Sequence, residues 1–224
     1  MTSRLNDPTI RRVLDRLFDL VEVQEASPLP IPPGFSFTSG PAQTRSDAMA
    51  SIYMPVCRRG GDLLYTLVRA IRPERIIEFG TSFGISTIYL AAAVADNGTG
   101  HVVTTELSAT KVQAARANLM ETGLFAHVTV LEGDALATLR DVPGPIAFAL
   151  LDGWKDLCLP LLRLLEPRLA PGAMVVADDT LQPAMAEYLE YVRDPGNGYV
   201  SVSFPVDDGM ELSCRSGTGQ AATL

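Results

Sequence analysis

The sequence predicts an α/β fold built on a doubly wound, mostly parallel β-sheet. Short apolar runs typical of buried strands alternate with longer segments that suit helices, and this alternation is typical of a parallel sheet covered on both faces. Strands are expected near residues 75–79, 101–106, 128–132, 146–151 and 173–177, and helices near 84–95, 108–122, 156–169 and 180–192. At the end of the chain, two β-prone runs, 199–206 and 211–214, flank the turn sequence Asp207-Asp208-Gly209, which predicts an antiparallel hairpin.

The N-terminal part of the chain has a different pattern. Residues 8–25 carry apolar side chains at helical spacing and predict an amphipathic helix that serves as a lid or as an oligomer contact; these side chains are Ile10, Val13, Leu14, Leu17, Phe18 and Val21. Residues 27–41 contain five prolines, which exclude regular structure. A second helix over 46–71 should end at Arg72-Pro73. We therefore expect residues 1–45 to form a lid segment and residues 46–224 to form the main globular domain.

Length and composition restrict the class of protein. A chain of 224 residues, 47% hydrophobic and 20% charged, suits one well-buried globular domain. The net charge of −8 argues against a nucleic-acid partner, because phosphate binding needs clustered basic residues. No apolar run reaches the roughly 18 residues of a membrane span, and the N-terminus lacks a signal core. The three cysteines are far apart in the sequence and suggest no disulfide framework. We expect a soluble cytoplasmic protein with no membrane association.

A glycine-containing loop follows the first predicted strand, in the run RIIEFGTSFGIS over 75–86. Gly80 permits a turn that a side chain would obstruct, and Gly84 should let the next helix begin close to a ligand. The spacing G-x-x-x-G does not match the dinucleotide motif G-x-G-x-x-G. Glu78, at the end of the strand, would repel a pyrophosphate and favour a ligand with positive charge. S-adenosylmethionine, which carries a sulfonium and an ammonium, fits this description.

Acidic residues follow the second and third strands, at the edge where open α/β sheets bind ligands. Glu106 lies 26 residues after Gly80, where nucleotide-binding folds place a carboxylate that binds the ribose hydroxyls. Asp134 follows the third strand and could reach an adenine amino group. The alternatives are an exposed strand-end acid for Glu106 and a helix N-cap for Asp134.

Three further carboxylates follow the fourth and fifth strands. Asp152 ends one apolar run, and Asp178 and Asp179 end the other. If these strands are neighbours, the three carboxylates would repel one another unless a cation lay between them. Oxygen ligands favour Mg²⁺, with Mn²⁺ or Ca²⁺ also suitable. The alternative is that Asp178 or Asp179 caps a helix beginning at Thr180.

Two residues beside Asp152 could complete a reaction site. Lys155 is close enough in sequence to reach the same site, and a metal and apolar surroundings would lower its pKa so that it could act as a general base. Trp154 could form a wall for an aromatic substrate. The alternatives are a surface position for Lys155 and core packing for Trp154.

Taken together, these motifs resemble the cation-dependent class I O-methyltransferases, a Rossmann-like family, and in particular the catechol O-methyltransferase group. The resemblance covers residues 45–215 or so. Residues 78–86 look like the loop that binds the methionine end of S-adenosylmethionine, and Glu106 matches the ribose-binding acid. The cofactor-binding residues that the resemblance and the strand-end pattern suggest are Glu78, Gly80, Ser82, Gly84, Ser86, Glu106, Asp134, Ala135 and Asp152.

The same resemblance implies roles for the catalytic half. Residues 152–156 are similar to the group's D-x-W-K-D segment, which implies Asp152 as a metal ligand, Trp154 as a hydrophobic gate and Lys155 as the base. Asp178 and Asp179 stand where the family has Asp-Asn, so a metal site of Asp152, Asp178 and Asp179 is expected. Gly209-Met210-Glu211 resembles a G-L-E segment whose glutamate holds the second substrate hydroxyl. The substrate-binding residues implied are Trp154, Lys155, Asp179 and Glu211.

The function expected from this resemblance is transfer of a methyl group to a hydroxyl of a catechol-like vicinal-diol aromatic acceptor. The partners would be a small aromatic molecule and a second copy of the chain in a homodimer. Two other classes stay open. One is another metal-bearing enzyme of the same fold, such as a hydroxylase, and the other is a non-catalytic module that binds S-adenosylmethionine.

Overall fold

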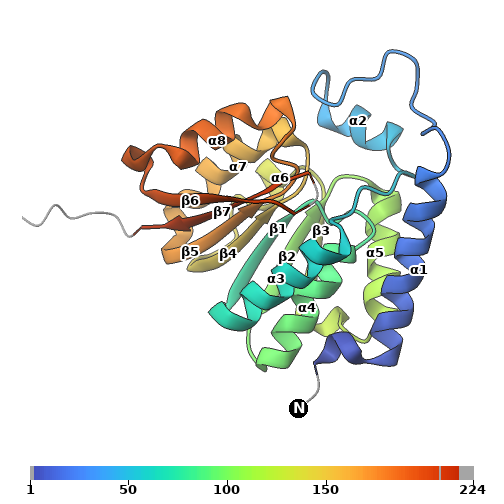
Figure 1. Ribbon diagram of the computed structural model, residues 1–224, viewed down its shortest axis with the longest axis horizontal. Coiled ribbons are helices and arrows are strands. Elements are labelled where there is room, and N and C mark those ends of the chain that lie inside the picture. Colours follow the sequence, from blue (N-terminus) through green and yellow to red (C-terminus); the bar gives the residue numbers. More distant parts are fainter. Residues whose placement is uncertain (1–2, 207, 217–224) are drawn as a thin grey trace, which may run out of the picture.

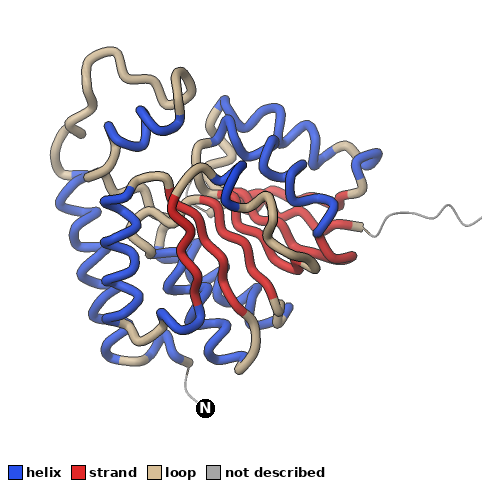
Figure 2. Tube along the Cα trace, turned by 180° about the vertical axis from the view of Figure 1, so that it is seen from behind, coloured by secondary structure: helices blue, strands red, loops and turns tan. Residues whose placement is uncertain are grey.

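A seven-stranded sheet lies between two layers of helices in the computed structural model, which describes residues 3–206 and 208–216 (Figures 1 and 2). The strand order is β3-β2-β1-β4-β5-β7-β6. The strands are β1 (Arg75–Phe79), β2 (His101–Glu106), β3 (Val128–Glu132), β4 (Ile146–Leu151), β5 (Leu169–Ala177), β6 (Tyr199–Phe204) and β7 (Met210–Arg215). Strands β1 to β5 are parallel to one another, and β7 and β6 add an antiparallel hairpin next to β5 at one edge. The predicted fold class is confirmed. Asp207, in the predicted turn, lies outside the described residues.

The two helical layers enclose two separate apolar cores, one on each face of the sheet. Helices α1 (Pro8–Glu25), α3 (Arg58–Ile71), α4 (Ile85–Asn97) and α5 (Ala109–Glu121) cover one face, and α6 (Ala135–Thr138), α7 (Cys158–Leu165) and α8 (Ala186–Arg193) cover the other (Figure 1). Short 3-10 turns complete the chain: η1 (Arg4–Asn6), η2 (Phe125–His127), η3 (Lys155–Leu157), η4 (Glu166–Arg168), η5 (Pro183–Met185) and η6 (Pro195–Asn197). Because successive strand residues face opposite layers, the central strands are apolar on both sides.

Helix α1 has the predicted bounds but is built into the core. All six apolar residues of its predicted stripe are buried, and it contacts α4 and α5. Asp7 caps its first turn by accepting from the backbone N–H groups of Thr9 and Ile10. The apolar face of α1 is therefore occupied within the subunit, so a dimer contact through this helix would have to use its polar face. The homodimer stays a prediction.

The predicted helix over 46–71 is two helices, α2 (Ala42–Ala48) and α3, separated by an irregular segment. Pro55 lies in this segment and cannot donate a helical hydrogen bond. The side chain of Gln24 replaces part of the lost pairing, because its amide binds both the N–H and the C=O of Tyr53 at 2.8 Å. Helix α2 and residues 27–41 stand at one end of the sheet, apart from both helical layers (Figure 1).

The boundaries of two later helices also differ from the prediction. The segments predicted over 156–169 and 180–192 begin with the 3-10 turns η3 and η5 and continue as the shorter helices α7 and α8. Pro183 opens η5, so the regular helix begins only at Ala186. Residues 178–182 are consequently free to form a loop at the carboxyl end of β5. None of the helices that the structure describes has both the length and the apolar character that a membrane crossing requires.

The functional site lies where the strand order reverses. Strand β1 has β2 on one side and β4 on the other. The connection after β1 runs to one side of the sheet and the connection that leads to β4 returns to the other, which leaves a crevice at the carboxyl ends of β1 and β4. Across this crevice the N–H of Asp152 donates to the carbonyl of Phe79 at 2.8 Å. Gly80 has φ +101°, and a Cβ there would run into the carbonyl of Asp152. The two loops can meet only because residue 80 has no side chain.

Gly80→Ala is expected to destabilise the fold by more than 2 kcal/mol, because both the positive φ and a backbone clash oppose the new Cβ. Gly98→Ala is the matched control, since Gly98 also has a positive φ but nothing lies within 4 Å of the added Cβ. Chemical denaturation of both variants separates the two contributions. Equal losses of unfolding free energy would contradict the proposed close approach.

Candidate functional site

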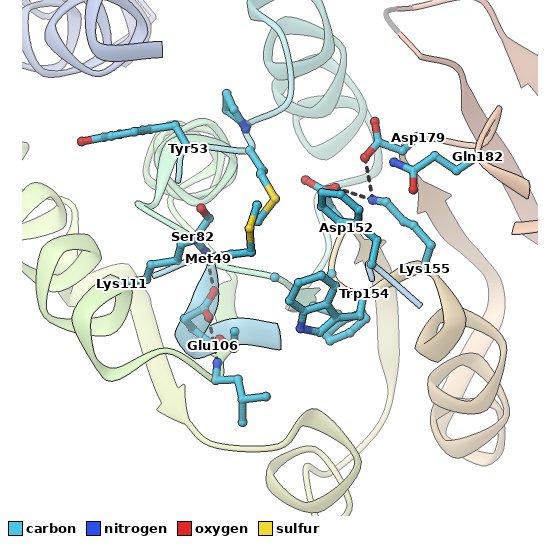
Figure 3. Close-up of a pocket in the computed structure, with 18 of the residues that line it drawn as sticks. Met49, Tyr53, Ser82, Glu106, Lys111, Asp152, Trp154, Lys155, Asp179 and Gln182 are labelled. Carbon is cyan, nitrogen blue, oxygen red and sulfur yellow. Dashed lines mark hydrogen bonds and ion pairs between the residues drawn. The ribbon is translucent and has the colours of Figure 1, made fainter. Parts of the chain in front are cut away.

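A cavity with a volume of about 390 Å³ opens at the carboxyl ends of β1, β2 and β4. Figure 3 shows two groups of polar side chains in it: Ser82, Glu106 and Lys111 on one side, and Asp152, Lys155 and Asp179 on the other. Residues of the lid segment 27–41 and of α2 also line it. The cavity therefore has room for an elongated ligand with different chemistry at its two ends.

The glycine loop forms the floor of the cavity. Gly80 and Ser82 line it, and Ser82 has φ +47°, a left-handed conformation that is rare for a residue with a side chain. Ser86 lines a small adjoining pocket together with Pro55 and Gly80. Gly84 lines neither pocket. Its φ of +89° is a conformation that favours glycine, and a Cβ there would make only an ordinary contact with Ala115 at 3.4 Å. Its cofactor-binding role stays a prediction.

Glu106 is fixed by the backbone around it. One carboxylate oxygen accepts from the N–H of Ser82 at 2.8 Å, and the other accepts from the N–H groups of Leu107 and Ser108 at 2.9 and 2.8 Å. The carboxylate lines the cavity beside the glycine loop. Such a rigid, ionised acceptor is suited to binding hydroxyl groups, as predicted for a ribose.

Asp134 is a helix N-cap, which was the alternative to cofactor binding. Its side chain caps α6 by accepting from the N–H of Leu136 at 2.9 Å. Neither Asp134 nor Ala135 is among the residues that line the cavity. Both residues lie near the carboxyl end of β3, and their cofactor-binding role stays a prediction.

Glu78 does not face the cavity, contrary to expectation. Its side chain is fully buried against α4, where it accepts from Thr87 Oγ1 at 2.6 Å, because the alternation of β1 turns it away from the crevice. Its other carboxylate oxygen has no hydrogen-bond partner among the described residues. Burial raises the pKa of Glu78 to about 7, against the opposing hydrogen bonds of Thr104 and Thr87. Glu78 therefore supports the strand beneath the site from the α4 side, and its cofactor-binding role stays a prediction.

This pKa predicts a pH-dependent stability. The pKa of Glu78 is about 7 in the folded protein and 4.5 as the ordinary value, so from pH 4.5 to 7 the unfolded chain loses the proton while the folded protein keeps it. The unfolding free energy therefore falls with rising pH in this window. Glu78→Gln should remove this loss. Its unfolding free energy, taken relative to that of the parent, should therefore rise by roughly 2–3 kcal/mol between pH 4.5 and pH 7.5. Denaturation at both pH values, with the exposed Glu74→Gln as control, checks this; a parallel pH profile would contradict it.

The three predicted metal ligands do come together. Strands β4 and β5 are neighbours, and Asp152, Asp178 and Asp179 each place a carboxylate oxygen within 4.8 Å of the others. No helix begins at Thr180, whose N–H donates to the carbonyl of Gly209, so the helix-cap alternative is excluded. Asp179, just after the end of β5, has φ +55°, a left-handed conformation that aspartate tolerates better than most residues with a side chain. The predicted acidic cluster is confirmed as a geometric fact.

Lys155 lies inside this cluster. Its Nζ is 2.9 Å from Asp152 Oδ1 and 3.0 Å from Asp179 Oδ2, and its side chain is 8% exposed (Figure 3). The surface alternative is excluded. Burial alone would lower the pKa of Lys155, but Asp152 and Asp179 raise it above its ordinary value. The expected lowering of the pKa is thus wrong for the ion-paired lysine, because two carboxylates flank the ammonium.

The carboxylates fit a hard divalent cation. Asp178 Oδ1 is buried without a hydrogen-bond partner among the described residues. Burial, followed by the charge of Asp152, raises the pKa of Asp178 to about 8, and burial together with Asp179 raises that of Asp152 to about 6 despite Lys155. One ammonium does not neutralise three clustered carboxylates, of which Asp178 is buried and Asp179 is partly exposed. A cation with a preference for oxygen ligands would satisfy both the charge and the orphaned atom.

Glu211 is not in the cavity, and this prediction is wrong. It is fully buried in β7, opposite Ala177 in β5, and its carboxylate accepts from Arg193 at 2.9 and 2.8 Å. Ser201 and Ser203 each donate to it at 2.7 Å. Since neighbouring strand residues face opposite sides, the register of β7 turns Glu211 toward α8. Asp208 lines the cavity instead.

Comparisons with known proteins agree with this geometry. Residues 77–180 match a family model described as a methyltransferase domain. The chain is 30% identical over 75% of its length to a catechol O-methyltransferase of Sus scrofa, of which the match covers 97%, and 30% identical over 68% to catechol O-methyltransferase B of Danio rerio. The match spans 62% of the zebrafish protein. A crystal structure of cofactor-bound Rv0187 from MTB has a TM-score of 0.68 at 25% identity, covering 79% of this chain and 89% of that one.

The chain belongs to the class I S-adenosylmethionine-dependent O-methyltransferases. Within that family it is similar to the catechol O-methyltransferases, as the sequence motifs indicated. The family model covers the glycine loop, Glu106 and the whole carboxylate cluster.

Arg45 of α2, which lies beside the site of the methyltransferase, is among the residues that sequence analysis missed. Its side chain is 4% exposed and forms two hydrogen bonds to Asp156, of 2.8 and 2.9 Å. The guanidinium lies 4.7 Å from the centre of the Trp154 ring and also donates to the carbonyl of Phe37. Arg45 therefore joins the lid to the segment that carries Lys155. Trp154 lines the cavity, as predicted, with Arg45 stacked against it.

Other residues of the methyltransferase cavity also gave no signal in the sequence. Tyr53 stacks on Phe83 with ring centres 3.9 Å apart and an interplanar angle of 15°. Further lining residues that no motif indicated are Glu25, Met49, Met54, Lys111 and Gln182. Three of these six residues, Met49, Tyr53 and Met54, lie in the irregular segment between α2 and α3, which has no recognisable spacing pattern.

Replacement of Arg45 in the methyltransferase should loosen the lid. Arg45→Lys keeps the charge but loses the two-pronged contact with Asp156, so we expect a loss of about 1–3 kcal/mol and faster amide exchange over residues 35–49. Arg58→Lys is the matched control, because Arg58 also pairs with a carboxylate, Asp15, and stacks on a ring, Phe18, but is 47% exposed. Amide hydrogen exchange over residues 35–49, measured for both variants, tests this expectation. Equal exchange in 35–49 would contradict the linking role of Arg45.

Proposed function

We propose that the protein transfers the methyl group of S-adenosylmethionine to a hydroxyl of a catechol-like aromatic acceptor held on a divalent cation, with Mg²⁺ the first choice. The observation that carries this proposal is the cluster of Asp152, Asp178, Asp179 and Lys155 at the end of the cavity farther from Glu106. Catechol O-methyltransferases are among the relatives of the chain, which supports the acceptor class.

The cofactor would lie along the floor of the cavity. Glu106 is positioned to accept hydrogen bonds from the ribose hydroxyls, and the loop of Gly80 and Ser82 leaves space for the methionine part beside Ser86. The negative charge of Asp152 lies at the same end and favours the positively charged sulfonium half. The chain thereby fixes the direction in which the cofactor binds.

The acceptor would bind between the lid and the acidic cluster. Trp154 supplies an aromatic wall, and the apolar side chains of Leu29, Phe37 and Met54 line the same cavity. When bound, a divalent ion would lower the pKa of a coordinated hydroxyl and would compete with Lys155 for the carboxylates. Holding the acceptor oxygen in line with the methyl and sulfur supplies much of the rate, because the reaction needs no covalent intermediate.

Lys155 is the residue that we assign to proton transfer. Its Nζ lies between Asp152 and Asp179, next to the place where an acceptor hydroxyl would be held. The two carboxylates fix the amine in one position, and an uncharged amine there can accept the hydroxyl proton. The lid, joined through Arg45 to Asp156, would exclude water from this step.

The rival functions have less support. A redox metal enzyme would favour histidine ligands, but His101 lies at the amino end of β2 and His127 just before β3, at the opposite edge of the sheet. A module that only binds S-adenosylmethionine would have no need for a buried lysine among three carboxylates. We therefore retain methyl transfer as the proposed activity.

The decisive experiment is a titration of S-adenosylmethionine by calorimetry, followed by an assay with a dihydroxybenzoate acceptor in Mg²⁺ or in EDTA. Cofactor binding and EDTA-sensitive methylation are the expected results. Cofactor binding with EDTA-insensitive methylation would show that the three aspartates are not metal ligands. Absence of cofactor binding would overturn the proposal.

Lys155→Ala should lower turnover at least 100-fold, because it removes the proposed base, and should leave cofactor affinity largely unchanged. Asp7→Ala is the control, since Asp7 also caps a helix and does not line the cavity. Calorimetry and the same assay measure both effects. An equal loss of cofactor binding in Lys155→Ala would count against its assignment.

A further inference from the structure

We propose that Lys111 is an additional cofactor-binding residue, which donates from Nζ to an acceptor atom in the nucleoside half of S-adenosylmethionine. This inference rests on the proposed function. No motif in the sequence indicated Lys111, and the assignment comes from its place in the cavity wall, its burial and its lack of an anionic partner.

The distribution of lysines in the chain is unusual. Of its 18 basic residues, 16 are arginine and only two are lysine, Lys111 and Lys155 (18 − 2 = 16). Every basic side chain other than these two, histidine apart, is therefore an arginine. Both lysines are buried, at 3% and 9% exposure, and both line the same cavity. Lys155 has partners in the acidic cluster, whereas Lys111 stands at the other side of the cavity (Figure 3).

Lys111 is held in place by its helix but not by any anion. It lies in the first turn of α5, where its N–H donates to Ser108, and its ammonium lies 5.6 Å from the centre of the Phe83 ring. No hydrogen bond or ion pair of Nζ is present among the described residues. Glu106 is the nearest source of negative charge in the cavity wall, but its oxygens accept from backbone N–H groups instead.

The Lys111 side chain is largely buried, and its ammonium, which reaches the cavity, has no partner among the described residues. Burial lowers the pKa of Lys111, and Glu106 opposes this only by its charge at a distance. Such a group is destabilising unless a ligand supplies the missing acceptor. Since the side chain reaches the cavity and does not serve the packing of the core, the acceptor is expected to come from the bound molecule.

The position favours the nucleoside half. Glu106 can only accept hydrogen bonds, and Lys111 can only donate them. A ribose with adjacent hydroxyls, or the ring nitrogens of adenine, offers both kinds of partner, so the two side chains are complementary. The methionine half instead lies toward Ser86 and Asp152, on the far side of the glycine loop.

The test compares Lys111→Met with the parent protein, because methionine has similar length and cannot donate. Binding of S-adenosylhomocysteine and of 5′-methylthioadenosine is measured by calorimetry. We expect both affinities to fall about tenfold, while the melting temperature of the free protein stays the same or rises. Lys111→Arg, which keeps the donor, should bind more tightly than Lys111→Met and guards against misfolding of a single variant.

Amine labelling gives an independent readout, since the chain has only two lysines. S-adenosylhomocysteine should protect Lys111 from acylation, as measured by mass spectrometry of the labelled peptide. A tenfold loss for S-adenosylhomocysteine but none for 5′-methylthioadenosine would overturn the nucleoside assignment, because only the former has a carboxylate. Unchanged affinities in Lys111→Met would overturn the role of Lys111. Failure of the parent protein to bind either ligand would instead refute the proposed function.

Discussion

The close backbone approach between the glycine loop and residues 152–153 is the constraint on which the rest of the site depends. Gly80 lies against the carbonyl of Asp152, and Asp152 in turn donates its N–H to Phe79. This contact joins the carboxyl ends of β1 and β4, where the direction of the chain reverses. It brings a surface for the cofactor and a cluster of carboxylates to the two ends of one cavity. Neither half of the site could react without the other at this distance.

Electrostatics gives the two ends of the cavity different characters. At one end Glu106 is an acceptor fully supported by backbone N–H groups, so its charge costs little. At the other end three clustered carboxylates lie around one lysine, which leaves an excess of negative charge in a partly desolvated region. Burial of charge is tolerated at a functional site when a ligand completes it. The second end thus keeps an excess of negative charge until a cation binds, whereas Glu106 at the first end has its hydrogen-bond donors before any ligand arrives.

The predictions from sequence succeeded where a pattern is local and failed where it is not. The bounds of β1, β2, β3 and β4 follow from continuous apolar runs, and the neighbouring positions of Asp152 and Asp178 follow from the order of parallel strands. Glu211 was misplaced because a strand shows two faces and sequence alone does not say which one meets the cavity. Arg45 lies 111 residues from Asp156, and no periodicity connects them.

The helical region before β1 shows a second kind of limit. Both α2 and α3 fit helical spacing, so a single helix over 46–71 was a reasonable interpretation, but the segment between them bends to line the cavity. Gln24, which lies in α1, holds that bend through two hydrogen bonds to Tyr53. Because the support comes from a distant helix, the propensities of the segment itself do not reveal it.

The lid combines two properties that are seldom found together. Residues 27–41 are mostly exposed and irregular, and the core of the protein does not depend on them, yet Arg45 anchors their far end beside the segment that carries Lys155. Substitutions along this stretch can therefore alter which acceptors enter without disturbing the sheet or the carboxylates. In evolutionary terms the lid is free to diversify while the chemistry stays constant, so related chains with the same cluster can be expected to differ first in this segment and in the molecules they accept.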